Sequence, residues 1–168
     1  MNENRSRPQI YEASASELDD YIDLVEEAAA WLWAKDIRQW RPGEHRAARS
    51  HLLNQLQHGC LILAAKDGRL AGGCLLTETA PAIWREETGD ALYLSGLVVA
   101  RWAAGQDLGS QILDAALEAA RRRGKTRVRL DCWDGNEFLK RYYLARGFED
   151  KGRVQEEDYW VRLFERTV

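Results

Sequence analysis

The sequence lacks the features that mark membrane, secreted and metal-binding proteins. No apolar run approaches the ~18 residues that cross a bilayer, and the polar segment Met1–Arg7 has no signal-peptide core. Only three cysteines occur, without paired spacing or a Cys/His cluster, which argues against a disulfide framework or a zinc site. We therefore expect a soluble cytoplasmic protein without a metal, in which Cys60, Cys74 and Cys132 are reduced and buried.

A large excess of charge of one sign is also missing. The 168 residues carry 24 Lys and Arg against 27 Asp and Glu, a net charge of -3, which favours neither nucleic acid nor an anionic membrane as a partner. The one basic run, Arg121–Lys125, is typical of a helix C-terminus, and a nucleic-acid patch is the weaker interpretation. The composition, 45% hydrophobic and 30% charged, predicts one globular domain over residues 1–168, either a monomer or a homodimer.

Hydrophobic periodicity predicts a mixed α/β chain. Ser14 and Glu17 have the spacing of a capping box ahead of the first helix, and Asp67-Gly68 predicts a tight hairpin. The predicted helices cover residues 15–35, 44–57, 108–123 and 137–146. The predicted strands cover residues 9–13, 60–65, 70–76, 91–99 and 127–132, with two more between 148 and 164 around a turn at 155–157.

A strand, a glycine-containing loop and a helix follow one another between residues 94 and 123. The first N–H groups of such a helix lack partners and form an anion site, and Gly105 and Gly109 leave room for a phosphate. The loop contains neither Gly-Lys-Ser/Thr nor Gly-x-Gly-x-x-Gly, so it is neither a P-loop nor a dinucleotide fingerprint. A tight connection without a ligand remains the alternative.

A more specific pattern follows, in which Asn136 precedes Tyr143 by seven residues and Gly147-Phe148 comes next. This segment resembles the end of a GNAT acetyltransferase. Val128-x-Leu-Asp-Cys-Trp-Asp-Gly-Asn, the strand ending Leu97-Val98-Val99 and the loop from Gly105 to Gly109 match the family in order and spacing. The resemblance is strong over residues 91–152 and weaker over 9–78.

The resemblance implies the GNAT acyl-CoA N-acyltransferase fold, with a mixed sheet of about seven strands, about four helices and two splayed central parallel strands. It also implies acetyl-CoA as cofactor and transfer of its acetyl group to a primary amine of a small molecule or peptide. Asn136 would contact the pantetheine, and Tyr143 would protonate the departing thiolate. The remaining cofactor contacts would come from Leu97, Val98, Val99, Ala104, Gly105, Gln106, Asp107, Leu108, Gly109 and Ser110.

The loop departs from the family pattern at two positions. Ala104 stands where the family usually has Arg or Gln, which removes a charge-assisted contact. Asp107 stands where the family has Gly, and an inward carboxylate would compete with a diphosphate for the helix amides. We expect an outward carboxylate, compensated by Arg101 or solvent. The departures keep open a second hypothesis, a CoA-binding or sensor domain without turnover.

The residues that would bind and deprotonate the acceptor are less clearly marked. Asp131 and Glu78 are the candidate bases, with a solvated or Arg-paired carboxylate as the alternative for each. The three histidines are interpreted as surface residues. Aromatic residues beside carboxylates can hold a cationic amine, which makes Trp31, Trp40, Trp84 and Tyr142 the candidate acceptor-binding residues. The same tryptophans could instead fill a core or form an interface, and an interaction domain is the third hypothesis.

Overall fold

The computed structural model describes residues 6–168, and its centre is one seven-stranded sheet in the order β1-β2-β3-β4-β5-β7-β6. Every neighbouring pair is antiparallel except β4 and β5, which are parallel. Most of the segment Met1–Arg7, on which the expected lack of a signal peptide rests, lies outside the described residues. The strands are β1 (Gln9–Ala13), β2 (Gly59–Lys66), β3 (Arg69–Thr77), β4 (Ala91–Val99), β5 (Arg127–Trp133), β6 (Glu149–Glu156) and β7 (Tyr159–Thr167).

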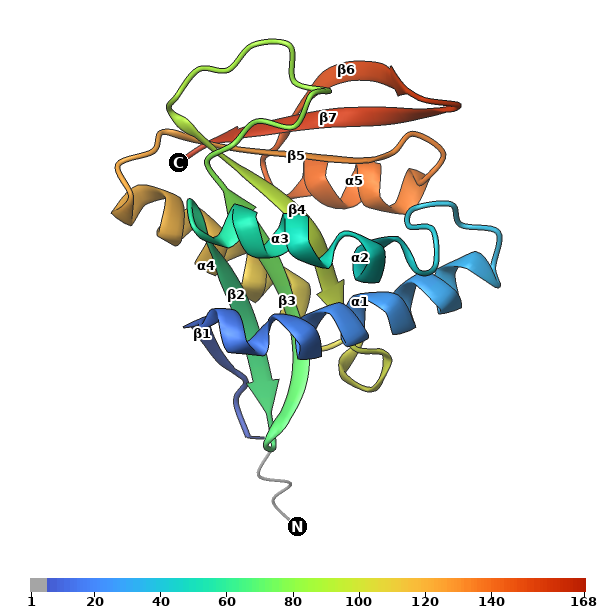
Figure 1. Cartoon of the computed structure of the whole chain (residues 1–168), viewed down its shortest axis with the longest axis vertical. Helices are drawn as coiled ribbons and strands as arrows, with labels where there is room; N and C mark the ends of the chain where they lie inside the picture. Colours follow the sequence, from blue (N-terminus) through green and yellow to red (C-terminus); the bar gives the residue numbers. More distant parts are fainter. Residues whose placement is uncertain (1–5) are drawn as a thin grey trace.

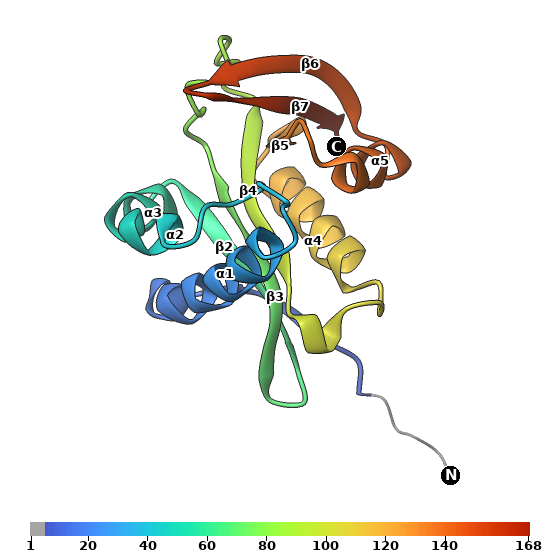
Figure 2. The same cartoon turned by 90° about the vertical axis from the view of Figure 1, so that its right-hand side faces the viewer.

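Helices cover both faces of this sheet. Figure 2 shows α1, α2 and α3 on one face and α4 and α5 on the other, with the β6–β7 hairpin extending over one end. The helices are α1 (Leu18–Trp33), α2 (Glu44–Ala47), α3 (Arg49–Leu56), α4 (Leu108–Arg122) and α5 (Glu137–Ala145), with short 3-10 turns at Ala15–Glu17 and Arg101–Ala103. The predicted mixed α/β fold is confirmed.

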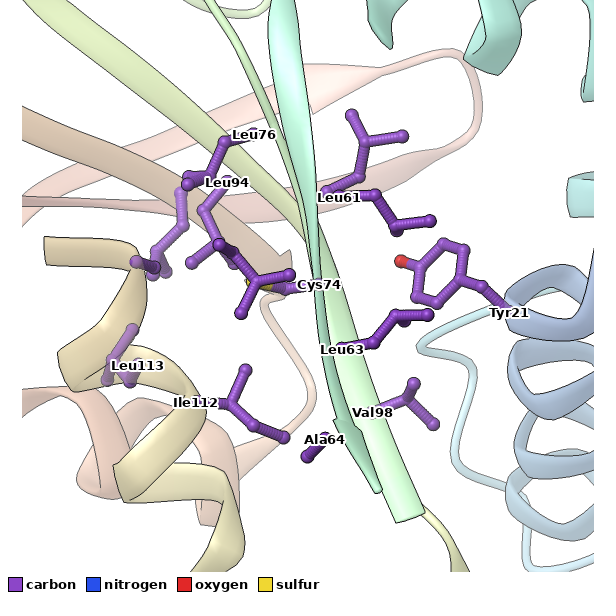
Figure 3. Packing of buried hydrophobic residues seen from close by; sticks show 14 of the residues in the cluster. Tyr21, Leu61, Leu63, Ala64, Cys74, Leu76, Leu94, Val98, Ile112 and Leu113 are labelled. Atoms are coloured by element: carbon purple, nitrogen blue, oxygen red, sulfur yellow. The ribbon is translucent and has the colours of Figure 1, made fainter. Parts of the chain in front are cut away.

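The core is built on both sides of the sheet, because the strands at its centre alternate apolar side chains between the two helical layers. Figure 3 shows Tyr21 of α1 beside Leu61 and Leu63, and Ile112 and Leu113 of α4 on the opposite side. All five side chains are at most 1% exposed. Burying each large apolar side chain contributes about 1.5–3 kcal/mol of stabilising free energy, which holds the helices against the sheet.

Local signals in the sequence placed most element boundaries. Glu17 Oε2 accepts a hydrogen bond of 3.1 Å from the Ser14 N–H within the predicted capping box. Asp67 and Gly68 both have positive φ, as a two-residue hairpin requires. The last hairpin turns at Glu157-Asp158, slightly beyond the predicted turn, and β7 continues to Thr167.

The helix predicted over residues 44–57 is broken, so residues 6–168 form five α-helices instead of about four. Ala48, with φ -86 and ψ 8, separates α2 from α3. The two pieces are held to α1 by separate contacts: Arg49 pairs with Asp19 at 2.6 Å, and the Glu26 carboxylate accepts hydrogen bonds from the Gly43 and Arg46 N–H groups that begin α2. Hydrophobic periodicity within one helix does not predict an ion pair that joins it to another helix.

The basic run and the cysteines behave as predicted. Helix α4 ends at Arg122, Gly124 has a positive φ, and Arg123 forms an ion pair of 2.7 Å with Glu12. All three cysteines are free and buried, and burial raises the pKa of Cys60 to about 11. No helix of residues 6–168 combines the length and the apolar character that a transmembrane span requires.

Candidate active site at the diverging strands

Strands β4 and β5 separate partway along their length. They pair only from Ala91 to Tyr93 on β4 and from Arg127 to Arg129 on β5. Strand β4 continues to Val99, while β5 continues to Trp133 and keeps its pairing with β7. Figure 1 shows the two strands running in different directions beyond this point. From Leu94 onward, therefore, the β4 edge that faces β5 has no partner strand in the described chain, which confirms the expected splay.

A bulge in β4 lies next to this gap. The β3–β4 register shifts between Ser95 and Val98, and Gly96 adopts φ +61. The Tyr21 hydroxyl donates a 2.8 Å hydrogen bond to the Gly96 carbonyl, and a Cβ on Gly96 would come within 2.0 Å of that hydroxyl. A buried tyrosine on α1 thus fixes the direction of β4 where it leaves β5. No motif in the sequence marks Tyr21, whose spacing from Leu18, Ile22 and Val25 is that of an ordinary buried helix position.

The predicted anion loop precedes α4 on the other face of the sheet. Gly105 has φ +77, and Asp107 occupies the N-cap position with φ +58 but makes no side-chain cap hydrogen bond. The first N–H groups of α4, from Leu108 to Ser110, therefore remain available as donors. The Asp107 side chain is 73% exposed and turns outward, as expected. Its partner is Arg146, at 3.8 Å, whereas Arg101 stacks on Trp31.

The absence of a side chain at Gly109 leaves room for a neighbouring residue of the protein. A Cβ there would meet the Tyr142 hydroxyl at 2.7 Å, so the glycine makes room for this side chain. A Cβ on Gly105 would meet nothing within 4 Å, and its positive φ is what favours glycine. The side chain of Tyr142, a residue of α5, therefore lies beside the start of α4 and does not line the cavity described below.

Arg146 brings a cation to the same loop. Its Nε donates to the Ser110 hydroxyl at 2.7 Å, and the guanidinium carbon lies 3.4 Å from the centre of the Tyr142 ring. Arg146 follows the last residue of α5 and stands 42 positions after Ala104 in the sequence. Arg146 therefore brings to this loop a positive charge that its own residue at position 104, an alanine, does not supply. Only the tertiary structure reveals this contact.

Tyr143 is enclosed beside the gap. It is 4% exposed and packs against the rings of Phe148 and Phe164. Burial raises its pKa far above the ordinary value, and negative charge on Cys132, Tyr142 and Asp131 would raise it further. The phenol is therefore protonated at neutral pH and can donate a proton. Because the charge of Asp131 acts on the Tyr143 phenol, the phenol lies near the point where β4 and β5 separate.

Asn136 links the end of β5 to α5. Its Oδ1 accepts a 3.1 Å hydrogen bond from the Leu139 N–H, which confirms the predicted N-cap. Its Nδ2 donates to Gln39 Oε1 at 3.2 Å, and the same oxygen accepts from the Trp133 N–H at 3.1 Å. Gln39 therefore ties the loop after α1 to the end of β5. No local pattern predicts these contacts, which join residues 94 and 97 positions apart.

A cavity of about 160 Å³ opens on the α1–α3 side of the gap. Gln39, Trp40, Glu44 and His45 line it from the segment after α1, and Ser95 and Gly96 from the β4 bulge. Asp131, Trp133, Glu156, Tyr159 and Val161 complete the lining from β5 and the β6–β7 hairpin. A second cavity, of about 220 Å³, lies at the β2–β3 hairpin and shares no lining residue with the first.

Asp131 is the carboxylate with the most unusual environment in this cavity. Burial raises its pKa to about 7, and the charge of Glu156 adds to the rise. Its small exposed surface faces the cavity, and protein atoms surround the rest. Glu78, the other candidate base, is exposed, pairs with Lys125 at 3.5 Å and does not line the cavity. Of the two carboxylates, the structure brings only Asp131 to the gap.

The predicted acceptor tryptophans do not come together. Of Trp31, Trp40 and Trp84, only Trp40 lines the cavity. Trp31 packs under the guanidinium of Arg101 at 3.8 Å, and Trp84 packs edge-on against Tyr93 at 6.2 Å and under Arg129 at 4.5 Å. Proximity in sequence misled here, because Trp31 lies on α1, Trp40 in the loop that follows it and Trp84 in the connection from β3 to β4.

His45 was expected at the surface, and this expectation is wrong. The ring is partly buried, lines the cavity and meets Trp40 edge-on at 5.5 Å between centroids. Burial lowers its pKa, against the opposing charges of Glu26 and Glu44, and its Nδ1 has no hydrogen-bond partner in the described chain. The polar surroundings of Pro42-Gly43 in the sequence concealed this position.

Comparisons with known proteins agree with this geometry. The sequence model of the acetyltransferase (GNAT) family matches residues 25–148. The uncharacterized N-acetyltransferase YesJ of Bacillus subtilis (strain 168) is 31% identical over 168 residues, which covers 96% of this chain and 88% of that protein.

Solved structures show the same fold at lower identity. A GNAT-family acetyltransferase from Listeria monocytogenes 4b F2365 superposes with a TM-score of 0.75 at 22% identity, covering 96% of this chain and 95% of that one. The putative acetyltransferase yncA from Salmonella typhimurium, solved with its cofactor acetyl-CoA, superposes with a TM-score of 0.71 at 16% identity, covering 96% and 94%.

Proposed function

Because this chain belongs to the acetyltransferase (GNAT) family, we propose that it transfers the acetyl group of acetyl-CoA to a primary amine. One observation carries the proposal. Where β4 parts from β5, Asp131 lines the cavity on one face of the sheet, while Tyr143 belongs to α5 on the other face, and the Asp131 charge contributes to the raised pKa of Tyr143. A base and an acid thus flank the same gap, as direct attack on a thioester requires.

The described residues fit acetyl-CoA as the cofactor, which the solved relative with acetyl-CoA supports. The free β4 edge from Leu97 to Val99 offers main-chain groups to the pantetheine arm. The α4 amides and the Arg146 guanidinium offer donors to the diphosphate. The outward Asp107 carboxylate leaves those amides unobstructed. Bound there, acetyl-CoA supplies the activated acetyl thioester.

Asp131 serves as the base in this proposal. A primary amine has a pKa near that of Lys, about 10.4, so at neutral pH it must lose a proton before its nitrogen can attack. Asp131, with a pKa of about 7, accepts this proton from the amine, directly or through one water. The amine nitrogen would then form the new bond to the carbonyl carbon, and a backbone N–H of β4 near Val98 would stabilise the carbonyl oxygen.

Tyr143 serves as the acid. When the carbon–sulfur bond breaks, its hydroxyl donates a proton to the departing sulfur, so that CoA leaves as a thiol. The buried phenol keeps its proton throughout the physiological pH range, so its O–H is available to the departing sulfur. We also propose that the protein is cytoplasmic, which its three free thiols support.

Two measurements test the function. Calorimetry with acetyl-CoA should show binding, and release of free CoA thiol should depend on an added amine. If acetyl-CoA binds but no amine in a broad panel releases thiol, the chain is a CoA-binding module without turnover. If acetyl-CoA does not bind, the proposed function is wrong. The assay is not disturbed by the protein's own thiols, because all three are buried.

A further inference from the structure

The cavity beside Asp131 is strongly unbalanced in charge. Three carboxylates line it, from Glu44, Asp131 and Glu156, whereas no lysine or arginine appears among the lining residues in the described chain. The basic side chains of the neighbouring β6–β7 hairpin are engaged elsewhere. Arg162 pairs with Asp134 at 3.0 Å, and Arg153 stacks on Trp160 at 4.4 Å.

His45 does not supply the missing positive charge. Burial lowers its pKa, so the ring is neutral at physiological pH. Its Nδ1 is buried without a hydrogen-bond partner in residues 6–168. An orphaned polar atom of this kind, in a residue that lines the cavity, indicates that a ligand or water completes the site.

Asp131 is a second group that is incomplete without a ligand. No donor or cation in the described chain pairs with its enclosed carboxylate, which faces the cavity. By contrast, Glu156 is positioned by its neighbour, since the Tyr159 hydroxyl donates to Glu156 Oε2 at 3.1 Å. Besides Glu44 at the start of α2, the cavity therefore has two anionic places, Asp131 at the gap and Glu156 at the end of β6.

Aromatic side chains accompany these carboxylates. Trp40, Trp133 and Tyr159 all line the same cavity. Indole and phenol faces attract cations and exclude water, which strengthens the attraction to a nearby carboxylate. Lined in this way, a volume of about 160 Å³ suits a small, compact cation.

We propose that the acceptor is a small amine that carries a second cationic group, held by Glu156 among these aromatic rings while its first amine lies at Asp131. This inference rests on the proposed acetyl transfer and adds the substrate class. A monoamine would occupy only one anionic place, and an amine with a carboxylate at its far end would be repelled by Glu156.

Three amines with a four-carbon chain test this assignment. The far end is cationic in 1,4-diaminobutane, apolar in n-butylamine and anionic in 4-aminobutanoate. We expect kcat/KM for the diamine to exceed that for butylamine at least tenfold, about 1.4 kcal/mol, with the aminobutanoate poorest. Equal values for diamine and butylamine, or a preference for the aminobutanoate, would overturn the proposal.

Two variants locate the second cationic group. Glu156→Gln should lower kcat/KM for the diamine about tenfold more than it changes kcat/KM for butylamine. Glu157→Gln is the matched control, because Glu157 lies on the same turn, is exposed and does not line the cavity. Equal losses in the two variants, or no loss in Glu156→Gln, would contradict the assignment.

Binding of 1,4-diaminobutane to the CoA-loaded protein, measured by calorimetry, separates this inference from the proposed function. If no amine is acetylated but the diamine binds and Glu156→Gln weakens it, the cavity assignment stands while the proposed function fails. If acetyl-CoA binds but the diamine neither binds nor reacts, the assignment is overturned.

Discussion

Burial of a carboxylate disfavours its charged form, and at Asp131 this raises the pKa to about 7. This raised pKa makes the stability of the folded protein depend on pH. Between the ordinary aspartate pKa and about 7, the folded protein holds a proton that the unfolded chain has lost, so stability falls as pH rises through this range. A residue retained at such a cost is typical of a functional site.

The variant Asp131→Asn should therefore gain stability relative to the parent as pH increases. We expect its melting temperature to exceed that of the parent at pH 8 and the difference to shrink toward pH 4, where both side chains are neutral. Thermal melts across this range measure the effect. A difference that does not depend on pH would mean that the Asp131 carboxylate is solvated.

The same residue should control the pH dependence of catalysis. Since the base must be ionised, amine-dependent thiol release by the parent should rise through pH 7, and Asp131→Asn should lower kcat and lose this inflection. Glu78→Gln, which alters the exposed carboxylate paired with Lys125, should retain the parent profile. An Asp131→Asn enzyme with full activity would remove Asp131 from the mechanism.

Tyr143 admits a sharper substitution, because only its hydroxyl is proposed to react. Tyr143→Phe keeps the ring against Phe148 and Phe164, so acetyl-CoA affinity should persist while kcat falls about 10²-fold, the lower range for a general acid. Tyr11→Phe, on exposed β1, is the control. Unchanged turnover in Tyr143→Phe would exclude the acid role.

At the scale of elements, α5 supplies to the α4 loop the cation that the loop itself lacks. Arg146→Ala should weaken acetyl-CoA binding about tenfold by calorimetry, since a charge-assisted contact contributes about 1.5–3 kcal/mol. Arg141→Ala removes an exposed arginine from the same helix and should leave affinity unchanged. Equal affinity in the two variants would show that the amides alone hold the diphosphate.

The β4 bulge depends on a glycine that has both a positive φ and a close neighbour. Gly96→Ala should destabilise the fold by more than about 2 kcal/mol, because it adds a clash with the Tyr21 hydroxyl to the strain of φ +61. Gly89→Ala, at φ +72 with nothing within 4 Å, isolates the strain alone, about 1 kcal/mol. Chemical denaturation compares them, and similar losses would argue against the contact.

Local elements could be predicted from sequence because their signals are local. The Asp67-Gly68 turn, the Asn136 cap and the start of β4 at Ala91 all follow from neighbouring residues. The break at Ala48 could not be predicted, because α1 holds α2 and α3 through separate side chains.

At the scale of the whole molecule, the site is assembled from segments that are distant in sequence. Tyr143, Asn136 and the α4 loop were identified through a resemblance concentrated in one half of the chain. Gln39, His45 and Glu156 reach the same region from the loop after α1, from α2 and from the last hairpin. The tryptophans illustrate the reverse error, since Trp31 and Trp40 are near in sequence while only Trp40 lines the cavity.

The order of the sheet explains why the gap persists in the folded protein. Strand β5 keeps a full antiparallel pairing with β7 up to Trp133 and Val161, while β4 remains paired with β3 up to Val99 and Gly72. Each strand is therefore held by its outer neighbour, and their separation does not require either to be loose. That residues 1–168 form one domain stays a prediction.

Hydrogen exchange on addition of acetyl-CoA measures most directly whether this gap holds the cofactor. Amides along the free β4 edge, residues 94–99, and in the α4 loop, residues 104–110, should exchange more slowly once acetyl-CoA is bound, while the β1–β2 pair is unaffected. Saturating acetyl-CoA that leaves exchange at both segments unchanged, or that protects only the β2–β3 hairpin, would contradict the account.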